Sequence, residues 1–94
     1  MSMELRDKVV VVTGGASGIG SGLCRRFREE GVRGLVIADL NGDSAAALAT
    51  ELDGTGYSLD VRDEAAVAAM VAETEVAFGQ IDLFCSNAGI LNLD

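Results

Sequence analysis

The sequence predicts an α/β fold, a doubly wound parallel sheet with helices on both faces. Strand-like apolar runs alternate with helix-like amphipathic segments along the 94 residues, and a glycine-rich turn joins the first strand to the first helix. The order of elements is β-α-β-α-β-α-β, and strict alternation of this kind gives parallel strands with right-handed crossovers. We expect residues 1–94 to form one domain, with an incomplete sheet of strand order 3-2-1-4 that continues in a longer chain.

The four strand segments differ in how completely we expect them to be buried. Residues 9–12 and 35–38 are continuous apolar runs, typical of strands covered on both faces. Residues 57–61 alternate apolar and polar side chains, which indicates an edge strand. Residues 81–85 form the fourth strand, whose outer edge we expect to be open and unpaired. An open edge favours aggregation, so we expect the 94 residues on their own to be unstable or to aggregate.

Three helices connect these strands. The first carries apolar residues at every fourth position from Ile19 to Phe27 and ends at Gly31. Residues 43–44 offer an N-cap for the second, whose apolar positions recur at i, i+3, i+4 and i+7. Asp63 is expected to cap the third. The apolar stripe of the third helix comprises Val67, Met70, Val71, Thr74 and Phe78.

Composition excludes several classes of partner. The net charge is −8 and there is no histidine, which argues against nucleic acid and anionic membranes, because both require a basic patch. The longest apolar runs are too short to span a bilayer, and the N-terminus has no secretory pattern. Cys24 and Cys85 are far apart and lack metal-ligand spacing, so we expect no metal site. Both are expected to be buried thiols in a cytoplasmic protein.

Residues 13–20, Thr-Gly-Gly-Ala-Ser-Gly-Ile-Gly, form the glycine-rich turn. Backbone N–H groups of such a turn approach a phosphate at the positive end of a helix dipole, and glycine is needed where a Cβ would block that approach. This placement makes the fold Rossmann-type. A P-loop is excluded, because the sole lysine, Lys8, precedes the first strand. The alternative is a tight connection that binds no ligand.

Asp39 follows the second strand, 19 residues after Gly20. At this sheet edge a carboxylate accepts hydrogen bonds from both hydroxyls of an adenosine ribose and repels a 2′-phosphate. No basic residue lies nearby in sequence, since position 16 is Ala and position 40 is Leu. The pattern therefore favours NAD over NADP. The alternative is a loop aspartate that starts the turn at 40–42.

Together these residues resemble the classical short-chain dehydrogenase/reductase family. The turn at 13–20 is similar to that family's Thr-Gly-x-x-x-Gly-x-Gly motif, and Asp39 stands where NAD-preferring members carry an acid. Residues 60–61 are similar to its Asp-Val pair, and residues 87–89 to the end of its Asn-Asn-Ala-Gly motif. The four motifs span essentially the whole chain in the right order.

The resemblance implies a cofactor site. The turn would hold the pyrophosphate, Asp39 the ribose and Asp60 the adenine amino group, while residues 87–89 would line the floor near the nicotinamide ribose. For Asp60 the alternative is to cap the following helix, and for Asn87 to satisfy backbone groups of a neighbouring strand. The implied cofactor-binding residues are Gly14, Ser17, Gly18, Ile19, Gly20, Asp39, Leu40, Asp60, Val61, Asn87, Ala88 and Gly89.

Two departures from the family pattern are apparent. Ser86 stands where the family usually has Asn, which puts its tie to the neighbouring strand in doubt. The family's catalytic Ser and Tyr-x-x-x-Lys normally lie beyond the fourth strand. Tyr57 is the only tyrosine, and four residues later stands Val61 rather than Lys, so we assign no catalytic residue within 1–94 and expect the 94 residues alone to be inactive.

The resemblance thus implies an NAD(H)-dependent oxidoreductase that interconverts a small-molecule secondary alcohol and a ketone. Family members often form dimers or tetramers, so a homo-oligomer is expected at full length. Two alternatives stay open: a non-catalytic nucleotide-binding module, and a domain for another adenosine ligand such as S-adenosylmethionine.

Overall fold

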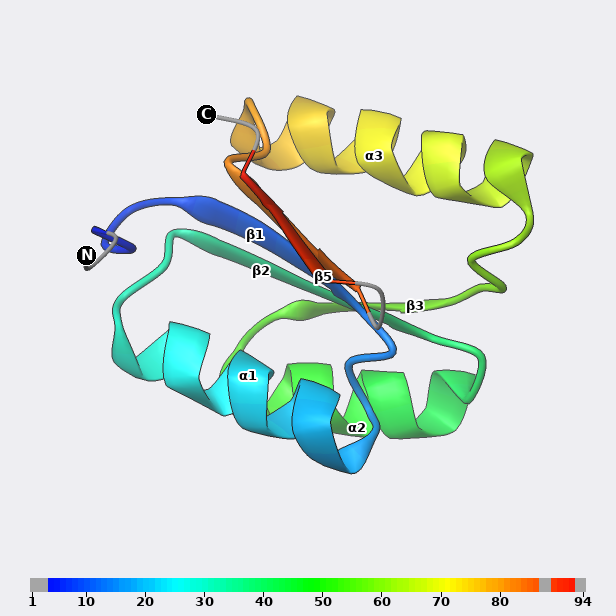
Figure 1. Cartoon of the computed structure of the whole chain (residues 1–94), viewed down its shortest axis with the longest axis horizontal. Coiled ribbons are helices and arrows are strands. Elements are labelled where there is room, and N and C mark those ends of the chain that lie inside the picture. Colours follow the sequence, from blue (N-terminus) through cyan, green and yellow to red (C-terminus); the bar gives the residue numbers. More distant parts are fainter. Residues whose placement is uncertain (1–3, 87–88, 93–94) are drawn as a thin grey trace.

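A computed structural model describes residues 4–86 and 89–92 and shows a sheet between two helical layers (Figure 1). Helices α1 and α2 cover one face of the sheet and α3 covers the other. The elements are β1 (Val9–Thr13), α1 (Gly18–Glu29), β2 (Gly34–Asp39), α2 (Gly42–Leu52), β3 (Thr55–Ser58), α3 (Glu64–Phe78), β4 (Leu83–Ser86) and β5 (Gly89–Asn92).

The sheet has the strand order β3-β2-β1-β4-β5, and its first four strands are parallel, which confirms the expected order 3-2-1-4. Val10 of β1 lies opposite Leu35 on one side and Leu83 on the other. Asp82 fixes this register at the start of β4, because its carboxylate accepts from the Val9 amide at 2.9 Å while its own amide donates to the Val9 carbonyl at 2.9 Å. The carboxyl ends of β1, β2 and β4 consequently meet at one edge.

The expectation of an open edge at the fourth strand is wrong. Strand β5 pairs with β4 in antiparallel fashion, with Ser86 opposite Gly89 and Leu83 opposite Asn92. The antiparallel pairing with β5 supplies partners for the backbone groups of β4. Instability of the isolated 94 residues stays a prediction, but an unpaired β4 is not its cause.

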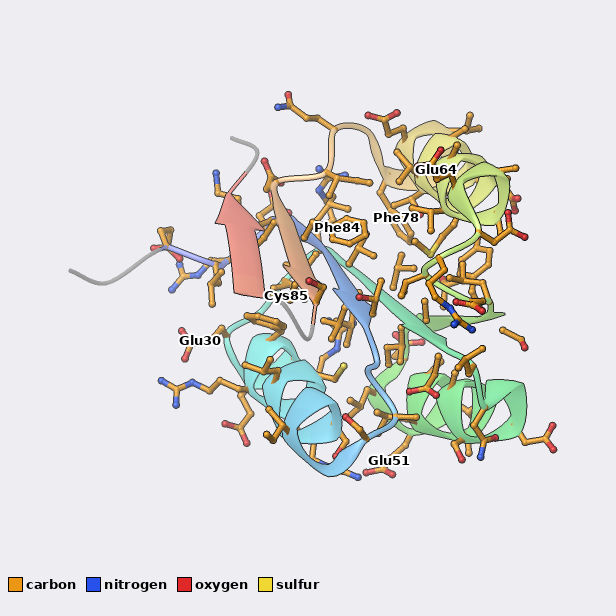
Figure 2. All side chains as sticks on the ribbon, turned by 45° about the vertical axis from the view of Figure 1, so that its right-hand side comes forward. Glu30, Glu51, Glu64, Phe78, Phe84 and Cys85 are labelled. Carbon is orange, nitrogen blue, oxygen red and sulfur yellow. The ribbon has the colours of Figure 1, made fainter. Side chains whose placement is uncertain are left out.

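Side chains of β1 alternate between two cores, as a strand covered on both faces requires. Val10 and Val12 face the α1 and α2 side, whereas Val9 and Val11 face the α3 side, and all four are at most 1% exposed. On β4, Phe84 lies beside Phe78 on the α3 side and Cys85 lies toward α1 (Figure 2). Residues 35–38 of β2 are also at most 1% exposed, so both runs that were predicted to be covered on two faces are buried.

The helix starts were predicted in part. Asp63 caps α3 as expected, accepting from the Ala66 amide at 3.1 Å. Helix α2 begins earlier than predicted, because Asn41 rather than residues 43–44 is its N-cap and accepts from the Ser44 amide at 3.1 Å.

Two segments differ from the predicted pattern. Strand β3 ends at Ser58 and does not continue through residue 61. On α1 the buried residues are Gly20, Cys24 and Phe27, whereas Ile19 is 84% exposed. Close approach of the helix to the turn at Gly20 makes this the buried face.

Met70 anchors α3 to the sheet at 1% exposure, whereas Val76 of the same helix is 90% exposed. Met70→Ala should lower the free energy of unfolding by about 2–5 kcal/mol, because it removes apolar contacts and leaves a cavity. Val76→Ala, the matched control, should change it by less than about 0.5 kcal/mol. Urea unfolding measures both, and equal effects would contradict this packing.

Candidate nucleotide-binding site

A cavity of about 440 Å³ lies at the carboxyl ends of the parallel strands. It is lined by Thr13, Gly14, Ser17, Asp39, Leu40, Leu59, Asp60, Val61 and Ser86. A second cavity of about 120 Å³ shares Thr13 and Ser86 with the first and extends under α1. It is lined by Val12, Thr13, Ile19, Gly20, Leu23, Cys85 and Ser86.

The structure thus brings together residues from three of the four predicted motifs: the turn, the acid after β2 and the pair at 60–61. Gly18 lines neither cavity but lies between Ser17 and Ile19, which line one each. Asn87 and Ala88 lie outside the described residues. Gly89 opens β5 opposite Ser86.

The glycine turn is tied to β2 through its backbone. The amides of Gly14 and Gly15 donate to the Ala38 carbonyl at 2.8 and 3.2 Å. The Ser17 hydroxyl donates to the Gly14 carbonyl at 2.8 Å and accepts from the Gly20 amide at 3.3 Å, so it closes the turn and caps α1 at once. The turn is therefore held without a ligand.

Two amides of the turn remain available. Gly18 and Ile19 are the first two residues of α1, and such positions have no acceptor within the helix. Within the part of the chain that the structure describes, neither amide donates to a protein acceptor. The helix dipole adds positive potential at this end, and Ser17 and Ile19 reach the cavities on either side. Chemically, the arrangement suits an anion.

The glycines of the turn serve different needs. A Cβ on Gly20 would lie 2.1 Å from the Gly14 carbonyl oxygen, and one on Gly15 would lie 2.7 Å from Cγ2 of Ile37. Gly14 has a φ of 70°, which favours glycine. A Cβ on Gly18, in contrast, would meet nothing within 4 Å. The fold itself requires glycine at positions 14, 15 and 20, whereas nothing in the fold requires glycine at 18.

Asp39 connects the turn to the end of β2. Its Oδ2 accepts from the Ala16 amide at 3.0 Å and its Oδ1 from the Asn41 amide at 2.9 Å. The contact with Ala16 joins residues 23 positions apart, so local sequence gave no sign of it. The contact with Asn41 matches the turn-forming alternative for Asp39, which therefore coexists with its place in the cavity wall.

Asp60 is paired with Arg62, a partner that the sequence analysis did not foresee. The Arg62 guanidinium donates to both carboxylate oxygens, at 2.8 Å from Nη2, and its amide donates at 2.9 Å. These hydrogen bonds, chiefly those from the side chain, lower the pKa of Asp60 from 3.8 to about 2. The helix cap considered for Asp60 is supplied by Asp63 instead.

Apolar side chains at the surface gather around this site. Of the four large apolar residues that are exposed in the described ranges, Ile19, Leu40 and Val61 line the two cavities. Only Val76 lies elsewhere, on α3. No basic side chain lines the larger cavity in the described ranges, and two carboxylates do. The cavity therefore offers apolar walls and hydrogen-bond acceptors.

Tyr57 and the two cysteines do not add reactive groups here. The Tyr57 hydroxyl donates to Oε1 of Glu73 at 3.3 Å, and Tyr57 does not line either cavity. Cys24 and Cys85 are buried and free, and burial raises the pKa of each thiol to about 11, so both are protonated at neutral pH. Cys85 lines the second cavity, and the Cys24 thiol donates to the Gly15 carbonyl of the turn at 3.9 Å.

Strand order, alternating helices and a glycine turn at the first crossover define a Rossmann-type α/β domain. Residues 8–94 match the short chain dehydrogenase family, and the chain belongs to that family. Within the described ranges, no helix combines the length and apolar character needed to cross a membrane.

The relatives carry several activities. The chain is 43% identical over 84 residues to 2-dehydro-3-deoxy-L-rhamnonate dehydrogenase (NAD(+)) of a Sphingomonas species, covering 88% of this chain and 33% of that one. It is 40% identical over 95 residues to (+)-cis,cis-nepetalactol synthase NEPS3 of Nepeta racemosa, covering 98% and 35%. The chain spans about a third of the length of the curated relatives it matches.

A solved structure shares the fold. The 3-ketoacyl-(acyl-carrier-protein) reductase of Brucella melitensis, complexed with NADH, superposes with a TM-score of 0.79 at 33% identity. The match covers 85% of this chain and 34% of the reductase.

Arg62→Ala should raise the pKa of Asp60 from about 2 toward 3.8, because the side-chain hydrogen bonds are lost while the backbone one remains. Carboxyl chemical shifts followed by NMR against pH measure this. Arg26→Ala, which removes a surface pair with Glu30 on α1, is the control and should leave Asp60 unchanged. An Asp60 pKa that stays near 2 without Arg62 would refute the pairing.

Proposed function

We propose that this chain binds NAD(H) and is the cofactor-binding part of an oxidoreductase that interconverts a secondary alcohol and a ketone. The observation that carries the proposal is the open position at Gly18. Two available amides and unfilled space meet there. The middle of the same turn is tied through the Ala16 amide to Asp39, the acid that lines the cavity.

In this proposal the diphosphate lies against the N-terminus of α1. The amides of Gly18 and Ile19 donate to its oxygens, and the helix dipole favours the negative charge. A Cβ at 18 would occupy the space that the anion needs, which gives the glycine a reason that the fold does not supply. Gly14, Ser17 and Gly20 hold the turn in shape around it.

Asp39 binds the adenosine ribose. Each of its oxygens accepts a hydrogen bond from one backbone amide, and each has a second lone pair that can accept from a ribose hydroxyl. A 2′-phosphate at this position would meet a carboxylate, and the larger cavity has no basic lining residue among those described. This supports NAD over NADP.

The adenine ring lies between Leu40 and Val61, whose apolar side chains are 70% and 56% exposed. Asp60 accepts a hydrogen bond from the exocyclic amino group, sharing its carboxylate with Arg62. Asn87, Ala88 and Gly89 are proposed to lie near the nicotinamide ribose, at the end of β4.

Membership of the family, and the relatives that are named a dehydrogenase and a reductase, support the reaction class. When bound, the cofactor supplies or accepts a hydride, and the residues described here bind and orient it. We assign the proton transfer to none of them. The substrate is a small alcohol or ketone, and a homo-oligomer in the cytoplasm is proposed for the whole enzyme, in keeping with two free thiols.

Gly18→Ala tests the proposal at its central point. The change should leave stability unchanged or slightly higher, since the new methyl meets no protein atom and alanine favours helix. It should weaken NADH binding at least tenfold, because the methyl enters the space for phosphate. Titration of NADH fluorescence measures binding, and urea unfolding measures stability.

Gly22→Ala is the matched control, since a Cβ there also meets nothing within 4 Å and the residue lies one turn further along α1. It should leave NADH affinity unchanged and raise the free energy of unfolding by up to about 1 kcal/mol, because alanine favours helix at this position too. Equal NADH affinity of the Gly18 and Gly22 variants, or no saturable binding by the unaltered protein, would refute the proposal.

Cofactor preference follows from Asp39. The unaltered protein should bind NADPH at least tenfold more weakly than NADH, equivalent to about 1.4 kcal/mol, because the extra phosphate meets the carboxylate. Competitive titration of the two reduced cofactors measures the ratio. Equal affinities for NADH and NADPH would contradict the proposed contact between Asp39 and the ribose.

A further inference from the structure

Asp39 contacts the turn as well as the cavity. Its carboxylate accepts from the amide of Ala16, in the middle of the turn, and from the amide of Asn41, where α2 is capped. A ribose-binding role accounts for a carboxylate at the cavity wall. It does not account for the two hydrogen bonds that the carboxylate accepts from the backbone, one on Oδ2 from the turn and one on Oδ1 from the α2 cap.

The other amides of the turn show why this matters. Gly14 and Gly15 donate to the Ala38 carbonyl, and Ser17 donates to the Gly14 carbonyl. In the described chain, the acceptor for Ala16 is the carboxylate of Asp39. Without that carboxylate, a half-buried amide loses its partner two residues before the first available amide of α1.

We propose that Asp39 is a positioning residue for diphosphate binding: through Ala16 it fixes the turn that presents the amides of Gly18 and Ile19. The ligand in this statement rests on the proposed function. Sugar recognition and diphosphate binding are then coupled through one carboxylate. A replacement at 39 that lacks an acceptor weakens binding even of nucleotides without ribose hydroxyls.

This consequence separates the positioning role from ribose contact alone. The nucleotide 2′,3′-dideoxy-ADP keeps the diphosphate and the adenine but has no hydroxyl for Asp39 to bind. If Asp39 acted on the ribose alone, its replacement would not weaken binding of this compound. Because the compound is an anion, loss of the negative charge at position 39 would strengthen its binding.

The experiment compares the unaltered protein with Asp39→Ala and Asp39→Asn, using ADP and 2′,3′-dideoxy-ADP in titration calorimetry. Both variants lose the charge and the acceptor for the Asn41 amide. The one oxygen that asparagine retains, turned toward the turn, accepts from the Ala16 amide. We expect Asp39→Ala to bind dideoxy-ADP at least fivefold more weakly than Asp39→Asn. Glu75→Ala, which removes an exposed acid of α3, is the charge control and should bind as the unaltered protein does.

Equal dideoxy-ADP affinity of the two Asp39 variants overturns the positioning role. A second readout needs no ligand: amide hydrogen exchange at Ala16 should be at least tenfold faster in Asp39→Ala than in Glu75→Ala. Unchanged exchange also overturns the role. If the unaltered protein binds neither nucleotide, the proposed function fails, and exchange at Ala16 still decides whether Asp39 fixes the turn.

Discussion

The site depends on the register in which β1 lies between β2 and β4. Val10 opposite both Leu35 and Leu83 sets the three strands so that they end at one edge. Asp82 fixes one side of this register through two hydrogen bonds to Val9. A shift by one residue would turn the β1 side chains to the opposite cores and separate the turn from Asp39. Strand pairing thus brings together the loops that line the cavity.

The turn shows how one glycine-rich segment meets two kinds of demand. At Gly20 the helix approaches the Gly14 carbonyl so closely that a Cβ would stand 2.1 Å away, which is a demand of packing. At Gly18 a Cβ would meet only open space, so packing does not require glycine there. The sequence motif does not distinguish these positions, because both are glycine. Only the surroundings of each Cα separate a residue that shapes the turn from one that lies beside open space.

Sequence patterns succeeded where the determinants are local. The Asp63 cap, the stripe of α3 and the buried run of β1 each follow from residues within a few positions of one another. Strand β5 was missed because its four residues have no periodic signal and pair with β4 only through a turn back. The α2 cap was misplaced because residues 41, 43 and 44 all carry capping side chains, and the path of the chain after β2 selects among them.

The site followed the same division. The lining of the candidate cavity was predictable in part: the turn and Asp39 stand at the ends of strands that the alternation identifies, and the resemblance to the family's Asp-Val pair added Asp60 and Val61. The contacts of those acids were not. Asp39 reaches Ala16 across 23 positions, whereas Arg62 is only two positions from Asp60 and was missed although the contact is local; it forms in a turn that the Asp63 amide closes by donating to the Asp60 carbonyl.

These contacts resolve an apparent conflict in a chain of net charge −8 that is proposed to bind an anion. Hydrogen bonds to the backbone fix Asp39, and Arg62 offsets the charge of Asp60. The attraction for phosphate then comes from oriented amides, which act over a short range and at one place. Under the proposed function, such a site would accept a diphosphate at the helix and reject a 2′-phosphate beside the acid, which is a selectivity that a basic surface would lose.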